Sequence, residues 1–146
     1  MIYISFVDID TFEISNISIL ILIILNIIFY ISQNGFNVFY RIFVNGIISA
    51  LIIFLIFFIS KEKAMGFGDV LLSFSLGLNF NIPKAILFNF LAFVIGGLIS
   101  IIIVLLINKK KLKSQIPFGP MISIAAYLTF LYGDAIINWY LGLITY

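Results

Sequence analysis

The chain has no cysteine and no histidine among its 146 residues. The absence of cysteine excludes disulfides, thiolate zinc sites and a cysteine nucleophile. The absence of histidine removes the usual general base, most metal sites and any Ser-His-Asp triad. Acid–base chemistry therefore depends on the six carboxylates, with tyrosine and lysine as more distant candidates. We expect no metal and no other cofactor.

Charge is also scarce. Charged residues make up 10% of the chain, hydrophobic residues make up 64%, and the mean hydropathy is +1.28. Such a chain is too apolar for a soluble domain and too short for several domains. The composition predicts an all-α, multi-pass transmembrane helix bundle of about five to six membrane segments, forming one membrane-embedded domain over residues 1–146. The N-terminus has no basic region, and acids stand where the apolar core of a signal peptide would lie.

Apolar runs separated by polar loops predict the individual segments. A spanning helix needs roughly 20 residues, so the longer runs are spanning candidates, and the run before Pro83 is a shorter piece. The last piece, amphipathic or spanning, carries Trp139 and Tyr140, which favour a membrane interface. The expected segments are residues 17–33, 41–60, 70–80, 84–107, 121–132 and 135–146.

The placement of lysine predicts the orientation. Six of the eight basic residues fall in loops on one side, whereas Arg41 and Lys84 flank loops on the other. The positive-inside rule puts the lysine-rich loops in the cytoplasm. Counting the crossings places Asp8 and Asp69 at that same cytoplasmic face of the cell membrane.

The stretch KAMGFGDVLLSFSLG, residues 63–77, places Asp69 behind two glycines at the start of an apolar run. A charge at the centre of a membrane helix costs about 2.5–3.5 kcal/mol on insertion scales. Charged residues near the bilayer therefore usually have a function. Gly66 and Gly68 permit a tight turn or a close approach of another segment. The alternative interpretation is a plain loop in which Asp69 caps the following helix.

A second group of acids lies in VDIDTFEISN, residues 7–16. Asp8 directly follows an apolar stub and lies deepest toward the bilayer, whereas Asp10 and Glu13 fit a solvated loop. Asp8 and Asp69 are thus expected to face each other. Two carboxylates that approach closely cannot both ionise, so they share a proton. One then activates a water while the other protonates the amide, which gives peptide hydrolysis without metal or histidine.

Two of these stretches resemble motifs of the type IV prepilin peptidases, membrane aspartic proteases with a GxGD signature. DIDTFEISN resembles the first motif, with Asp8 at the first catalytic aspartate and Asn16 at the closing polar residue. GFGDVLL resembles GxGDxKL, with Gly66 and Gly68 as the motif glycines and Asp69 as the second catalytic aspartate.

A third stretch, IPFGP at residues 116–120, also resembles this family and contributes Pro117, Gly119 and Pro120. Their alternative role is to start a helix. The resemblance implies cleavage of the leader peptide from type IV prepilin-like precursors at the cytoplasmic membrane face. The implied partners are a precursor with a basic leader and an apolar helix, together with the lipid bilayer, and we expect no nucleic acid.

The chain departs from the family pattern in several places. Ser15 stands where the family usually has proline, and Leu71 stands where its motif has lysine. Lys61 or Lys63 is a candidate to supply the missing charge. The family's cysteine-bearing N-terminal domain is not found, so we expect peptidase activity without N-methylation. The stub at residues 1–7 is too short to span, so the first helix is expected to be truncated.

Two other functions are carried as alternatives. A catalytically silent relative acting in pilus or secretion assembly would fit Leu71 and the short stub. A small cation-conducting membrane protein would use Asp8 and Asp69 as cation ligands, but the spans contain no further acids to continue such a pathway. An intramembrane protease of presenilin type shares only GxGD and would place its acids within spanning helices.

The remaining polar residues in apolar runs are interpreted as structural. Asn26, Asn45 and Asn89 are expected to bridge helices rather than to bind a ligand. Asp134 is expected to cap a last short helix on the outer side.

Overall fold

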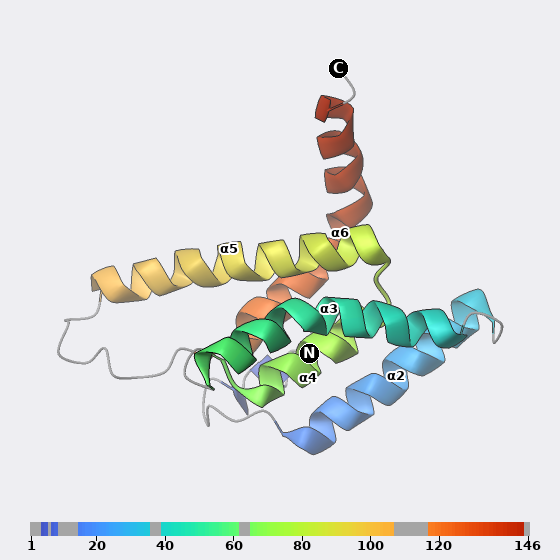
Figure 1. Cartoon of the computed structure of the whole chain (residues 1–146), viewed down its shortest axis with the longest axis horizontal. Helices are drawn as coiled ribbons and strands as arrows, with labels where there is room; N and C mark the ends of the chain where they lie inside the picture. The colour runs from blue at the N-terminus through green and yellow to red at the C-terminus, as the bar shows by residue number, and fades with distance from the viewer. Residues whose placement is uncertain are drawn as a thin grey trace.

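The computed structural model describes residues 4–5, 7–8, 15–35, 39–61, 65–106 and 117–144, and within them every regular element is helical (Figure 1). Ile4, Ser5, Val7 and Asp8 are also helical. The all-α prediction is therefore confirmed. The five helices are α2 (Asn16–Asn34), α3 (Phe39–Ser60), α4 (Phe67–Gly77), α5 (Ile82–Leu106) and α6 (Gly119–Ile144).

Four of these helices, α2, α3, α5 and α6, are long and apolar enough to cross a membrane, whereas α4 has only 11 residues. These helices expose more apolar side-chain surface than soluble proteins expose to water. In the most apolar window of α2, only 6% of the residues are buried inside the protein. Outward-facing Ile and Leu at this density match the lipid tails of a bilayer. The protein is therefore a multi-pass membrane protein, as the composition predicted.

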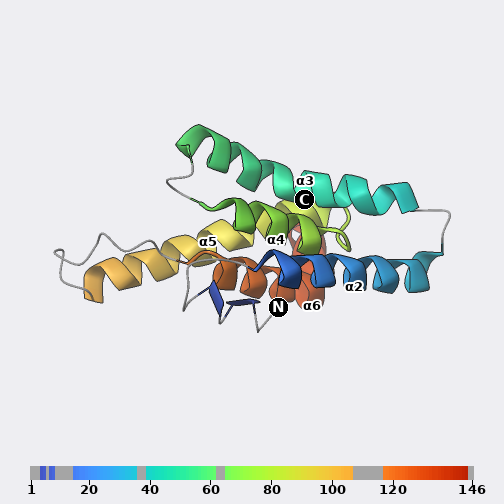
Figure 2. The same ribbon diagram turned by 90° about the horizontal axis from the view of Figure 1, so that it is seen from below.

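Helix α4 occupies the centre of the bundle. It packs against α2, α3 and α6, while α5 packs against α3 and α6, and Figure 2 shows α4 lying between α3 and α2. Its inward residues include Val70, Leu72 and Leu76, which join the buried core. Small residues let α3 and α4 approach closely: a Cβ on Gly46 would lie 2.9 Å from Phe74 Cε2 of α4.

The predicted boundary between segments 121–132 and 135–146 was wrong. Helix α6 runs without interruption from Gly119 to Ile144, and Asp134 lies inside it rather than at the cap of a short helix. A glycine inside a helix costs only about 1 kcal/mol, so Gly133 did not stop it. The C-terminal part of α6, red in Figure 1, projects away from the other helices.

Two of the three asparagines bridge helices as predicted. The Asn26 side chain in α2 donates to the Ser75 carbonyl of α4 at 3.1 Å. The buried Asn89 side chain in α5 donates to the Ser49 carbonyl of α3 at 2.9 Å. Asn45 differs, because it lines a pocket and its side chain has no hydrogen-bond partner in the described part of the chain.

Replacing Asn89 by alanine is expected to lower the free energy of unfolding by about 0.6–1.7 kcal/mol, the range measured for hydrogen bonds between membrane helices. The bond to the Ser49 carbonyl joins α5 to α3, so its loss weakens that contact. Unfolding in detergent micelles measures the change. Asn45→Ala is the matched control and should change stability less. Equal losses in the two variants would contradict the bridging role.

Candidate active site

Asp8 is buried, with 4% of its surface exposed. The backbone N–H of Gly119 donates a hydrogen bond to its Oδ2 at 2.9 Å. Gly119 is the first residue of α6, so the carboxylate lies at a helix N-terminus, where unpaired N–H groups and the helix dipole favour negative charge. These two residues are 111 positions apart. The fold thus holds Asp8 against the start of α6.

Asp69 lies in the first turn of α4, outside the four candidate spans. The prediction had started this helix at residue 70, but it begins at Phe67. The backbone N–H of Gly66, the N-cap residue, donates to Asp69 Oδ2 at 3.1 Å. This is the carboxylate half of a capping box. Asp69 is therefore not the N-cap residue that the alternative interpretation made it, although its carboxylate does accept the N–H of the N-cap residue Gly66. Asp69 is also buried, at 7% exposure.

The two carboxylates interact. Burial raises the pKa of Asp69 to about 7, the hydrogen bond from Gly66 opposes that rise, and the charge of Asp8 adds to it. Burial likewise raises the pKa of Asp8, against the hydrogen bond from Gly119. The structure therefore brings Asp8 and Asp69 close enough for one charge to act on the other. Chemically, such a pair can hold one proton near neutral pH.

Gly119 permits the close approach of Asp8. A Cβ at this position would lie 2.6 Å from Asp8 Oδ2 and 3.2 Å from its Cγ, so any side chain would displace the carboxylate. Pro120 follows in the first turn of α6, where the missing N–H breaks no helical bond. Pro117 precedes the helix in an irregular segment and is half-buried. The stretch predicted to start a helix thus also supplies a hydrogen-bond donor to Asp8.

The other motif residues are less directly involved. Gly68 lies in the first turn of α4 and is half-buried. Asn16 begins α2, is exposed, and makes no hydrogen bond with Asp8 or Asp69 within the described residues. Lys61 is exposed directly after α3.

Several predicted residues lie outside the described ones. Asp10, Glu13 and Lys63 belong to this group, as does the basic stretch at 109–113. Among the described residues, no group of three or more acids forms a metal-binding cluster.

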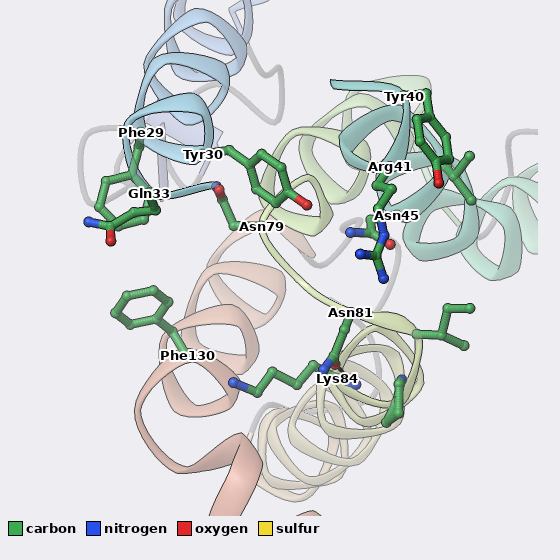
Figure 3. A pocket seen from close by; sticks show the side chains of 13 residues that line it. Phe29, Tyr30, Gln33, Tyr40, Arg41, Asn45, Asn79, Asn81, Lys84 and Phe130 are labelled. Atoms are coloured by element: carbon green, nitrogen blue, oxygen red, sulfur yellow. Dashed lines mark hydrogen bonds between the residues drawn. The ribbon is translucent and has the colours of Figure 1, made fainter. Parts of the chain in front are cut away.

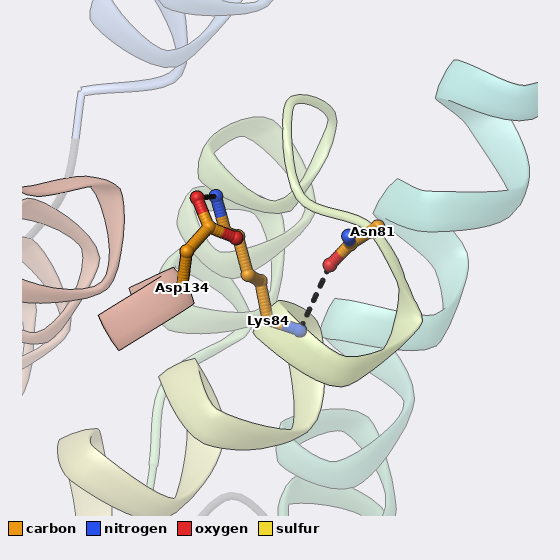
Figure 4. A network of polar contacts seen from close by, with 3 residues as sticks. All are labelled: Asn81, Lys84 and Asp134. Atoms are coloured by element: carbon orange, nitrogen blue, oxygen red, sulfur yellow. Dashed lines mark hydrogen bonds and ion pairs between the residues drawn. The ribbon is translucent and has the colours of Figure 1, made fainter. Parts of the chain in front are cut away.

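The sequence analysis missed an ion pair at the opposite end of the bundle. Lys84 Nζ lies 2.7 Å from Asp134 Oδ2, joining α5 to α6, while the Lys84 backbone N–H donates to Asn81 Oδ1 (Figure 4). Asp134 is 75% exposed, so this pair adds little stability. The crossing count places both residues on the same side with opposite charges, but nothing in the sequence pairs these two across 50 positions.

Fold and site together define a multi-pass helical membrane protein with two buried, electrostatically coupled aspartates. The chain belongs to the type IV leader peptidase family, whose model matches residues 1–101. This confirms the predicted family. The matched range contains Asp8 and the GFGD stretch, but not residues 116–120. No solved structure matches the chain.

Individual relatives agree with this assignment. A prepilin leader peptidase/N-methyltransferase of Aeromonas salmonicida is 34% identical over 86 residues, covering 59% of this chain and 29% of that protein. The protein of the same name from Legionella pneumophila is 33% identical over 92 residues, covering 63% of this chain and 32% of its own length. The chain therefore matches less than a third of the length of these curated relatives.

Proposed function

We propose that this chain is a membrane aspartic endopeptidase that removes the leader peptide from type IV prepilin-like precursors. Asp8 and Asp69 are its catalytic residues, and the chain acts as a single membrane domain. Its active site faces the cytoplasm, as the lysine distribution indicates. The single observation that carries the proposal is the burial of two carboxylates, Asp8 and Asp69, at the positions that match the motif aspartates.

The environments of the two aspartates suggest different roles. Asp8 accepts a hydrogen bond at the N-terminus of the long helix α6 and is the ionised member. Asp69, with its pKa near 7, is the protonated member. Asp8 takes a proton from a water molecule, whose oxygen bonds to the carbonyl carbon of the scissile peptide, while Asp69 protonates the carbonyl oxygen. The C–N bond then breaks, a proton passes to the leaving nitrogen, and one water is consumed.

The surroundings of the pair fit a substrate that is partly embedded in lipid. Phe67 precedes Asp69 by two residues, is exposed, and packs its ring against Phe57 at 5.6 Å. This apolar surface beside a carboxylate suits the junction between a polar leader and an apolar helix. The precursor helix would lie in the bilayer beside the spans, and the acids would attract the basic leader.

Co-expression in membranes tests the proposal. A tagged precursor with a basic leader and an apolar helix is expected to be shortened by the wild-type chain and not by the Asp69→Asn variant. A precursor whose leader lacks basic residues is the matched substrate control. Equal processing by wild type and Asp69→Asn would exclude this dyad.

The cleavage rate is expected to fall as pH rises through about 7. Below this value Asp69 keeps its proton while Asp8 is ionised, and above it the pair loses the proton that the carbonyl oxygen must receive. The decline should approach tenfold per pH unit. At low pH the rate falls again, because Asp8 then binds a proton and no longer acts as base. Initial rates measured in liposomes across pH give the profile, and a rate that keeps rising above pH 7 would contradict it.

A catalytically silent relative is the second candidate. Leu71, where the family motif has lysine, is half-buried two residues after Asp69. Without that positive charge, the ionised form of the aspartate pair is less stabilised. If wild type cleaves no precursor and Leu71→Lys does, the silent interpretation is correct for this chain.

A further inference from the structure

A polar pocket lies at the end of the bundle opposite the two aspartates. Its volume is about 590 Å³, within the ~300–1,000 Å³ of typical ligand sites. Its walls come from the end of α2, the start of α3, the turn after α4, the start of α5 and one residue of α6. Five elements therefore converge on a space that the proposed peptidase chemistry does not use.

The pocket carries positive charge and no acid among its lining residues. Arg41 and Lys84 both line it. Lys84 is paired with Asp134, which lies outside the pocket lining. Arg41 has no ion-pair partner within the described residues, so one positive charge is left uncompensated. Figure 3 shows the Arg41 side chain extending from α3 toward the space that Asn81 and Lys84 border from the other side.

Neutral polar groups complete the lining. Asn45, Asn81 and Gln33 bring side-chain amides that can donate hydrogen bonds. The Asn79 amide also lines the pocket, but it donates to Asn26 Oδ1 at 2.7 Å. Tyr30 extends into the same space from α2 (Figure 3). A basic group surrounded by neutral donors is suited to an anion with several acceptor oxygens, such as a phosphate.

The rim of the pocket is apolar and belongs to the lipid-facing surface. Phe29, Val44, Ile82 and Phe130 line it and are 46%, 45%, 52% and 57% exposed. They lie on helices that are candidate membrane spans. A ligand held here would therefore place its anion among donors and its apolar part against these side chains.

We propose that this pocket binds the phosphodiester headgroup of an anionic phospholipid, with phosphatidylglycerol as the probe. The planar guanidinium of Arg41 can engage two phosphate oxygens at once. The amides bind the remaining oxygens, and the acyl chains lie along the apolar rim. The site is independent of Asp8 and Asp69, so its existence does not depend on the proposed function.

Native mass spectrometry of the purified full chain, after exchange into phosphatidylglycerol or phosphatidylcholine micelles, tests the proposal. Phosphatidylglycerol should stay bound to wild type, and Arg41→Gln should weaken it on the order of tenfold, the ratio that corresponds to a charge-assisted hydrogen bond. Lys61→Gln is the matched control, because it removes an exposed positive charge at the other end of α3. Arg41→Lys keeps the charge and should retain more lipid than Arg41→Gln.

Three results would overturn the proposal. Equal phosphatidylglycerol retention in Arg41→Gln and Lys61→Gln would exclude the pocket as the site. Equal retention of phosphatidylcholine would exclude a preference for anionic lipid. Binding of inorganic phosphate alone that displaces the lipid would identify a free-anion site instead. The readout does not involve cleavage, so an inactive chain can still confirm the lipid site.

Discussion

Asp8→Asn and Asp69→Asn are each expected to reduce the rate of leader cleavage by about 10³-fold or more, because each variant loses general acid–base catalysis and activation of the attacking water together. With Asp8→Asn, the amide at this position is unable to take a proton from water. With Asp69→Asn, the proton that the carbonyl oxygen must receive is missing. The double variant should be little slower than either single variant, because residues that act as a unit are not additive. Initial cleavage rates in liposomes measure all three.

Asp134→Asn is the control for these variants. It removes a carboxylate from the same chain, but from an exposed position at the opposite end of the bundle. Its cleavage rate should match wild type. Additive losses in the double Asp8 and Asp69 variant would mean that the two carboxylates act separately.

Gly119→Ala is expected to lower the cleavage rate by about 10²-fold, the effect of misplacing a catalytic group by roughly 1 Å. The new Cβ would lie 2.6 Å from Asp8 Oδ2, and the carboxylate would have to move away. Because the backbone N–H of Gly119 also holds Asp8, the same change disturbs the hydrogen bond that favours its ionised form. The pH profile should therefore shift together with the rate.

Gly97→Ala is the matched control for this variant. Gly97 also lies in a long apolar helix, but a Cβ there would meet nothing within 4 Å. It should leave both rate and profile unchanged. If Gly119→Ala retains full activity, the position of Asp8 does not depend on the start of α6.

Features set by composition and local pattern were predictable from the sequence. Long apolar runs predicted α2, α3 and α5 to within a few residues, because the bilayer imposes a fixed helix length. The expectation that Asp8 and Asp69 face each other came from crossing parity, which puts both acids at the same predicted side of the membrane. Asn26 and Asn89 bridge helices because a polar amide facing the interior of an apolar bundle is stabilised by a hydrogen-bond partner.

Features that depend on distant contacts were not predictable. Nothing local connects Gly119 to Asp8, because the bond joins residues 111 positions apart. Lys84 and Asp134 pair across 50 positions, and the local Gly–Asp pattern favoured a helix boundary that the fold does not have. The pocket around Arg41 is formed by five elements, none of which is a site alone. In each case the contact depends on how the helices pack against one another and not on the spacing of residues along the sequence.

The most direct test of the account is the intact mass of a prepilin-like precursor after incubation with the purified chain in liposomes, beside Asp69→Asn as the matched control. The account predicts one product, whose mass places the cut between the basic leader and the apolar helix, and no product with the variant. A precursor that keeps its full mass with the wild-type chain would contradict the peptidase assignment. A product formed equally by the variant would contradict the aspartate pair.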